Sequence, residues 1–307
     1  MFSRCAPNQC VFSRTALACA LASALAGCQS LTQRGPVSKE VQSCRQLSSQ
    51  GMAAIERGEW QKAEELLSSA IKSCPVDTEA RRRYAEALWH RGDAAAAMGQ
   101  LEEAARLSPE RPELAIRMGE IYLALDHWDN ARRAADQALA VDCRNPAAWS
   151  LRARAAQGAG DLRQAMADFQ RALGYQPNDP VVLQEVAELY RRMGQPERAL
   201  TTLQRLIDSY PPGEEPPRAL HLQGLALHAL SRHDAAIESY NLAIHRNGTS
   251  PDLLCHLAEA ELAVGRHEEA QQTVEKALAI APGHRAGQAL AARMQLAESV
   301  PPDRIRR

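Results

Sequence analysis

The eight cysteines and nine histidines of this 307-residue chain are the side chains most able to bind a metal, form a disulfide or carry a covalent group. His221, His228, Cys255 and His256 fall on two segments that we expect to be neighbouring helices. A soft-metal site is conceivable there, but these side chains serve equally well as ordinary polar groups of a surface. We favour the second interpretation and predict no metal site and no other cofactor.

The short motifs of common enzyme active sites are missing from the sequence. It contains no GxxxxGKS/T, HExxH, GxSxG or CxxC pattern. His267 is followed by Glu268 and Glu269, but no second histidine stands at the spacing that a zinc site needs. The formal net charge of −1 provides no global attraction to nucleic acid. We therefore expect neither an enzyme nor a nucleic-acid-binding protein, and no small-molecule substrate is evident.

The N-terminal residues show a pattern typical of export. Residues 1–14 include two arginines and no acidic residue, and residues 15–26 form a mainly apolar run. This run is too short for a membrane-spanning helix and suits the core of a signal peptide. It ends in four residues that resemble the bacterial lipobox, namely Leu25, Ala26, Gly27 and Cys28.

The lipobox resemblance implies that residues 1–27 are removed as a lipoprotein signal peptide and that the Cys28 thiol carries a diacylglyceryl group. Two acyl chains hold a protein stably on a membrane. Residues 28–43 would form a short tether, and Gln29 favours the outer membrane, facing the periplasm, under the family sorting rule. The alternatives are an ordinary signal peptide, or a soluble cytoplasmic protein whose alanine-rich start is a buried helix.

A fixed period of 34 residues runs through the rest of the chain. Within each period two small residues stand seven apart, such as Ala63 and Ala70, and therefore share one helix face. A larger residue between them fills the gap, while glycine permits the turn and proline ends the helix. The first small residue returns as Ala63, Ala97, Ala131, Ala165, Ala199, Ala236 and Ala270.

This pattern resembles the tetratricopeptide repeat, most clearly in Trp149, Ala153, Ala165, Phe169, Ala172 and Pro177. The resemblance implies an all-α, right-handed superhelix of about seven helix-turn-helix repeats that binds other proteins. We expect a capping helix over residues 285–298 and a disordered tail over 299–307. The predicted repeats span residues 44–77, 78–111, 112–145, 146–179, 180–216, 217–250 and 251–284.

The fifth repeat is three residues longer than the others because of a proline-rich segment at residues 211–217. It could be a joint between two stacks. We favour a longer surface loop within one continuous stack.

The family resemblance also implies a binding groove on the concave face, lined by the first helix of each repeat. Trp89 falls at a groove position and is the predicted anchor for a partner, whereas Trp60, Trp128 and Trp149 fall at packing positions. The arginines either grip a partner carboxylate or pair with neighbouring glutamates, and we favour the pairing. The predicted groove residues are Arg82, Arg83, Glu86, Trp89, Arg117, Glu120, Arg154 and Glu188.

Cys44 and Cys74 are expected at the two ends of the first helical hairpin, where antiparallel helices bring them together. Exported proteins can form disulfides. We predict a Cys44–Cys74 disulfide, and the alternative is two unpaired thiols slightly too far apart. Cys143 and Cys255 lie far apart in the predicted stack and are expected to stay free.

These observations predict a membrane-anchored scaffold lipoprotein that binds partner proteins in the bacterial cell envelope. Similar lipoproteins help to assemble pili or secretion pores, or regulate cell-wall enzymes. One alternative is a soluble cytoplasmic interaction protein with the same repeats. The other is a metal-binding or catalytic protein that uses the groove, and the missing motifs argue against it.

Overall fold

The computed structural model describes residues 39–299, and the predicted all-α solenoid is confirmed. The predicted signal peptide, Cys28 and nearly all of the predicted tail lie outside the described residues. The helices of the described range are α1 (Lys39–Glu56), α2 (Trp60–Ser73), α3 (Thr78–His90), α4 (Ala94–Leu107), α5 (Pro112–Ala124), α6 (Trp128–Val141), α7 (Pro146–Gly158), α8 (Leu162–Tyr175), α9 (Pro180–Arg192), α10 (Pro196–Ile207), α11 (Pro217–Ala229), α12 (His233–His245), α13 (Pro251–Ala263), α14 (His267–Ile280) and α15 (Arg285–Ser299).

Local sequence rules set most of the helix ends. The Asp77 side chain accepts a hydrogen bond from the backbone N–H of Ala80 at 3.0 Å and so caps α3. Six helices, α5, α7, α9, α10, α11 and α13, carry proline in their first turn, where its missing N–H costs nothing. The turn inside each hairpin needs a residue whose backbone adopts the left-handed conformation, with a positive φ angle. Glycine supplies it in five hairpins, and Asp126 and Ser231, each with φ of 58°, supply it in two others.

The two helices of a hairpin approach closely because a small residue faces a large one. A Cβ atom added to Gly224 on α11 would lie 2.3 Å from the Tyr240 ring on α12. A Cβ added to Gly51 on α1 would lie 2.6 Å from Leu67 on α2. Both large side chains are almost fully buried. The alanine-rich composition of the repeat therefore follows from the short distance between helix backbones.

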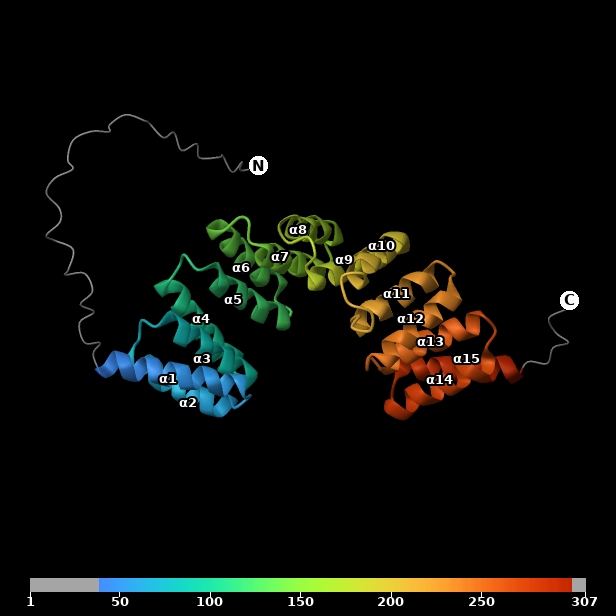
Figure 1. Cartoon of the computed structure of the whole chain (residues 1–307), viewed down its shortest axis with the longest axis horizontal. Coiled ribbons are helices and arrows are strands. Elements are labelled where there is room, and N and C mark those ends of the chain that lie inside the picture. Colours follow the sequence, from blue (N-terminus) through green and yellow to red (C-terminus); the bar gives the residue numbers. More distant parts are fainter. Residues whose placement is uncertain (1–38, 300–307) are drawn as a thin grey trace, which may run out of the picture.

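The helix pairs stack into an arch (Figure 1). Odd-numbered helices contact one another along the stack, as α5 does α7 and α11 does α13, whereas no comparable contact joins even-numbered helices within the described range. Helices on the inner side of a curved stack must be closer than those on the outer side. In the middle of the arch, α5, α7 and α9 accordingly lie inside and α6, α8 and α10 outside (Figure 1).

The core continues across the proline-rich segment 211–217. Leu203 and Leu206 of α10 share one buried cluster with Ala219 and Leu222 of α11. Glu215 within the segment pairs with Arg246 at 3.1 Å. The two sides are thus packed together as one stack, which is the arrangement that we favoured.

The two ends of the described range differ slightly from the expected boundaries. α1 begins at Lys39, within the segment expected to be a tether, and α15 packs against α13 and α14 as expected of a cap. Between residues 39 and 299, no helix combines the length and the apolar character needed to cross a membrane.

Candidate functional site

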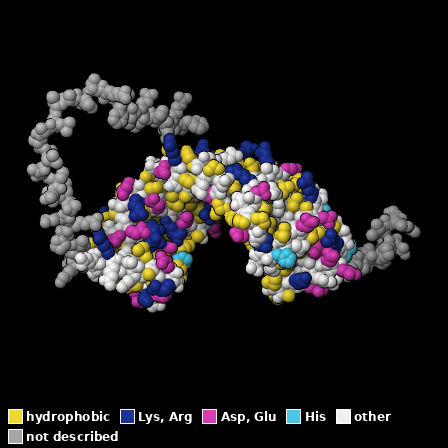
Figure 2. All heavy atoms as spheres, viewed as in Figure 1, with side chains coloured by type: hydrophobic (Ala, Val, Ile, Leu, Met, Phe, Trp, Pro, Cys, Tyr) yellow, Lys and Arg dark blue, Asp and Glu magenta, His cyan; other side chains and the backbone are white. Residues whose placement is uncertain are grey.

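The N-terminal arm shows basic and acidic side chains side by side on the face toward the viewer (Figure 2). Arginines of α3 pair with glutamates of the same helix. On α3, the Arg82 Nε atom donates to Glu79 at 3.1 Å and the Arg83 Nε atom donates to the same carboxylate at 3.0 Å. Arg111, which precedes α5, reaches Glu79 as well, at 3.4 Å. Arg83 also contacts Glu86 at 3.3 Å. The structure thus gathers three guanidinium groups around one carboxylate, a cluster that we call the arginine strip.

The electrostatics of the arginine strip keep its groups charged. Hydrogen bonds from Arg82, followed by the nearby charges of Arg82 and Arg83, lower the pKa of Glu79 to about 2 although partial burial opposes this shift. The same pairing raises the pKa of Arg82. Arg82 and Arg83 of the predicted groove are therefore paired with glutamates, which is the interpretation that we favoured. Arg117 follows the rule, because it pairs with Glu120 at 2.8 Å.

Trp89 lies at the C-terminal end of α3 and is half-buried, whereas Glu79 and Arg82 of the arginine strip lie in the first half of the same helix. It packs against the buried cluster that includes Leu88, Leu101 and Met118, so one part of its ring stays accessible. The other tryptophans are half-buried too, rather than fully internal. Trp60, for example, stacks on His90 with ring centroids 3.9 Å apart.

The remaining predicted groove residues lie farther along the arch. Arg154 is exposed on α7. Glu188 on α9 pairs with Arg191 at 2.7 Å, one helical turn away. These residues do not join the arginine strip, so the structure divides the predicted set into an N-terminal cluster and scattered side chains.

In the C-terminal arm, histidines occupy the repeat positions that Arg82 and Arg83 occupy in the N-terminal arm. His221 on α11 and His256 on α13 share a hydrogen bond of 3.0 Å between ring nitrogens. Burial and the neighbouring His256 lower the pKa of His221 to about 4, and burial also lowers the pKa of His256. Cys255 points instead to His284, at 3.6 Å. Among residues 39–299, no group of three or more His, Cys, Asp or Glu side chains is arranged to hold a metal ion.

The cysteines at the start of the array lie near each other with free thiols. Cys44 is buried, and its Sγ atom lies 3.6 Å from the carbonyl oxygen of Ala70 and 3.9 Å from Asp77. Burial, with the neighbouring Cys74 and Asp77, raises the pKa of the Cys44 thiol to about 12. The Cys44–Cys74 disulfide stays a prediction.

A second polar cluster, which the sequence reasoning missed, lies on the outer side of the arch. Arg152 of α7 donates to both oxygens of Asp168 on α8, each at 2.9 Å, and to Asp136 on α6 at 2.8 Å. The Trp149 ring lies 4.4 Å from the Arg152 guanidinium and 4.7 Å from that of Arg171. Arg152 stands sixteen residues from each of its two carboxylates, and that spacing was the available signal.

Arg152 fills one of a series of equivalent spaces. We use "outer gap" for the space that two successive even-numbered helices leave above the odd-numbered helix between them. In the outer gap over α11, Gln223 occupies the place of Arg152 and contacts Gln204 on α10 and Ser239 on α12. A polar side chain thus bridges the even-numbered helices over both α7 and α11.

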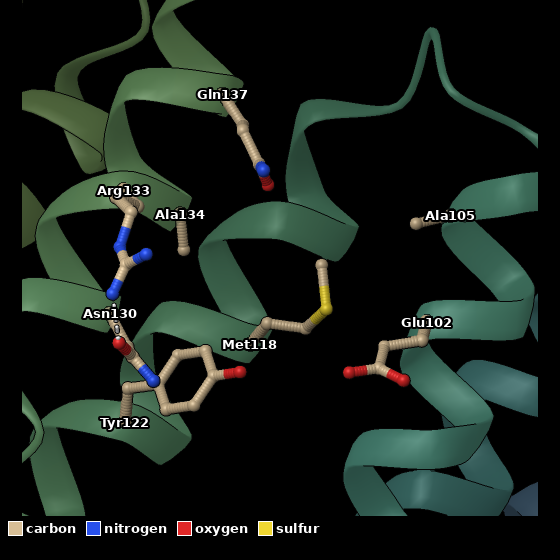
Figure 3. Close-up of a pocket in the computed structure, with 8 residues that line it drawn as sticks. All are labelled: Glu102, Ala105, Met118, Tyr122, Asn130, Arg133, Ala134 and Gln137. Atoms are coloured by element: carbon tan, nitrogen blue, oxygen red, sulfur yellow. Dashed lines mark hydrogen bonds between the residues drawn. The ribbon is translucent and has the colours of Figure 1, made fainter.

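Two other outer gaps remain open. Over α5 the bridging place holds Met118, and a cavity of about 400 Å³ lies between Glu102 of α4 and the polar residues of α6 (Figure 3). In that cavity Arg133 donates to Asn130 at 2.7 Å. Over α13 the same place holds Leu257, and a cavity of about 600 Å³ is present.

The sequence pattern of the tetratricopeptide repeat matches residues 49–112, 88–155, 156–224 and 227–294. The chain belongs to the tetratricopeptide repeat family. Such repeats present surfaces that bind other proteins, and the tandem hairpins of the arch agree with this assignment.

Solved structures share the fold at low sequence identity. A tetratricopeptide repeat protein from Parabacteroides merdae superimposes with a TM-score of 0.64 at 15% identity, over 83% of this chain and 99% of that protein. The pilF protein of Pseudomonas aeruginosa superimposes with a TM-score of 0.55 at 14% identity, over 83% of this chain and 99% of that one. At such identities the likeness shows the fold.

A curated relative has a closer sequence over a shorter stretch. Cellulose synthase operon protein C of Escherichia coli strain K12 is 34% identical over 107 residues, which is 30% of this chain. The match spans 9% of that protein's length.

Proposed function

We propose that this protein is a membrane-anchored, non-catalytic scaffold of the bacterial cell envelope whose inner groove binds a segment of a partner protein. The observation that carries the proposal is the arginine strip, which shares α3 with the half-buried Trp89. Cys28 would hold the scaffold at the membrane, and the groove would present the partner there. The machinery served would assemble pili or secretion pores, or act on the cell wall.

The chemistry of the strip favours a partner segment with carboxylates next to a large apolar residue. Each guanidinium has about five N–H donors, and the intramolecular glutamates use only some of them. The remaining donors can bind a carboxylate, while the half-buried ring of Trp89 offers the kind of surface that anchors interfaces. The relative named for a cellulose synthase operon adds polysaccharide synthesis to the processes that the scaffold could serve.

The test is a cross-linked pull-down of the tagged protein from its own membrane fraction. Wild type should co-purify with envelope assembly proteins. The Cys28→Ala variant should become soluble and lose them. If both forms behave alike and capture cytoplasmic proteins, the anchored scaffold is wrong and a soluble interaction protein takes its place.

Two matched pairs of variants test the groove itself. Trp89→Ala should weaken capture of the partner, whereas Trp60→Ala on α2 should not. Likewise, the double variant Arg82→Ala and Arg83→Ala should weaken capture more than Arg132→Ala and Arg133→Ala on α6. Loss of helical circular dichroism in Trp89→Ala would mean that Trp89 is needed for folding, and the groove assignment would fail.

We also propose that Cys44 and Cys74 form a disulfide after export, since the two thiols already lie near each other. In the chain-entropy model a loop of this length contributes roughly 3–4 kcal/mol. A reducing agent should therefore lower the melting temperature of wild type and leave Cys44→Ser unchanged. Equal responses of the two proteins would show that no such bond forms.

A further inference from the structure

The outer gap over α13 is a cavity of about 600 Å³ between α12 and α14. This volume lies in the range of sites that bind small molecules or single side chains. Its apolar wall includes Ile244 from α12, and Leu254 and Leu257 from α13. The cavity is on the opposite side of the arch from the proposed partner groove, so it does not belong to that site.

Glu261, one of the residues that line this cavity, is a buried carboxylate with an unsatisfied oxygen. The residue is 6% exposed, and its Oε2 atom has no hydrogen-bond partner among the described residues. Burial raises the pKa of the Glu261 carboxyl, although a hydrogen bond with Thr273 opposes the shift. A buried carboxylate oxygen without a partner is costly, and a native structure that retains one needs an explanation.

The position of Glu261 in its repeat is also unusual. It is the eleventh residue of the seventh predicted repeat. None of the other six repeats places an acidic or basic residue there. The equivalent residues are Ala54, Leu88, Tyr122, Ala156, Tyr190 and Leu227. Packing of the repeat therefore does not require a carboxylate at its eleventh residue.

The charges that line the cavity favour a cation. Glu261 and Glu269 contribute two negative charges and Lys276 contributes one positive charge, so the Glu and Lys side chains of the lining sum to −1. A compact ammonium suits this lining better than a planar guanidinium, because a guanidinium needs two coplanar acceptors and the Oε2 atom of Glu261 has almost no accessible surface.

We propose that the outer gap over α13 binds an aliphatic primary ammonium group, which pairs with the carboxylate of Glu261. The aliphatic stem then lies against Leu254 and Leu257, and Glu269 adds a second negative charge. The same chemistry is offered by a free alkylamine and by a lysine side chain of a partner. Both sources use the same acceptor and the same apolar wall.

The experiment is an NMR titration of the purified full chain with n-butylammonium chloride, and with 1-butanol as the uncharged probe of similar shape. We expect a dissociation constant of about millimolar for the ammonium, as fits so small a ligand, and no saturable binding of the alcohol. Equal responses to both probes would overturn the proposal, and so would no binding of either.

A matched pair of variants on α13 assigns the acceptor. Glu261→Gln removes the charge inside the cavity and should weaken ammonium binding by about tenfold or more. Glu259→Gln removes an exposed charge two residues away and should leave the constant within about twofold. Unchanged binding in Glu261→Gln would overturn the assignment. If that variant does not fold, ammonium should still raise the melting temperature of wild type and not that of Glu261→Leu.

Two peptides identify the source of the amine. Acetyl-Gly-Lys-Gly-amide is compared with its norleucine counterpart, which lacks the ammonium. Binding of the lysine peptide supports a partner side chain, and binding of n-butylammonium without the peptide supports a free amine. A norleucine peptide that binds as well as the lysine peptide would contradict the ammonium assignment.

Discussion

Two outer gaps of the arch each bury a carboxylate, and they treat it in opposite ways. Over α7, Asp168 is fully buried and accepts hydrogen bonds from Arg152 and Gln164 at 2.9 Å. Over α13, Glu261 is almost as buried, yet one of its oxygens has no partner in the described part of the chain. The same backbone arrangement therefore holds a satisfied charge in one repeat and an unsatisfied one in another.

The seventh residue of each repeat makes the difference. Arg152 at that place is long and charged, so it reaches both neighbouring even-numbered helices and closes the gap. Leu257 at the same place of the last repeat can do neither, and the gap stays open. A stack of near-identical backbones can thus gain or lose a cavity through one side chain.

The largest expected effect concerns the satisfied carboxylate. Asp168→Ala leaves Arg152 without its buried partner and should lower the free energy of unfolding by about 3–5 kcal/mol. Asp136→Ala removes the exposed partner of the same arginine and should cost less than about 1 kcal/mol. Urea unfolding followed by circular dichroism measures both values. Similar losses of unfolding free energy in the two variants would show that burial of Asp168 does not strengthen its pairing with Arg152. The contrast between the two outer gaps would then fail.

The unsatisfied carboxylate should respond in the opposite direction. Glu261→Leu removes a buried acceptor that lacks a partner and should raise the free energy of unfolding by about 1–3 kcal/mol at neutral pH. Glu259→Leu, at an exposed place on the same helix, serves as the control and should change little. A destabilised Glu261→Leu variant would mean that the Oε2 atom of Glu261 also has a partner in solution.

The pH dependence sharpens this point. The folded-state pKa of Glu261 is raised above its ordinary value of 4.5, so its charged form opposes folding. The penalty is absent below pH 4.5 and grows as the pH rises through the raised pKa. The difference in melting temperature between Glu261→Leu and wild type should therefore shrink on acidification. A difference that does not change with pH would contradict a buried, titrating Glu261.

The smallest effect is expected for a paired carboxylate that remains partly exposed. The pKa of Glu79 is lowered to about 2, so its contribution is present above pH 4.5 and is lost as the pH falls toward 2. Because the side chain is 38% exposed, solvent screening keeps that contribution below about 1 kcal/mol. Melting temperatures of wild type and Glu79→Gln should converge at acidic pH. A difference in melting temperature at neutral pH that corresponds to more than about 1 kcal/mol would mean that the arginine strip also stabilises the fold.

Much of the fold could be predicted because the information is local and repeated. Small residues seven apart, a turn residue and a proline recur in register, and each acts through backbone conformation or contact within one hairpin. The arginine strip was partly predictable for the same reason, since Arg82 and Glu79 stand one helical turn apart. Arg111 was missed as a member because it reaches Glu79 from the next repeat.

The sequence by itself determined the repeat, its helical hairpins and the membership of the family. The tertiary structure decided which polar side chains share a space, because those contacts join helices that are neighbours only after the stack has curved. Arg152 binds two carboxylates, each sixteen residues away along the chain. The Oε2 atom of Glu261, in contrast, has no hydrogen-bond donor among the described residues. Local sequence rules do not distinguish the two buried carboxylates. Whether each one is paired depends on the side chains that the neighbouring helices place in its outer gap.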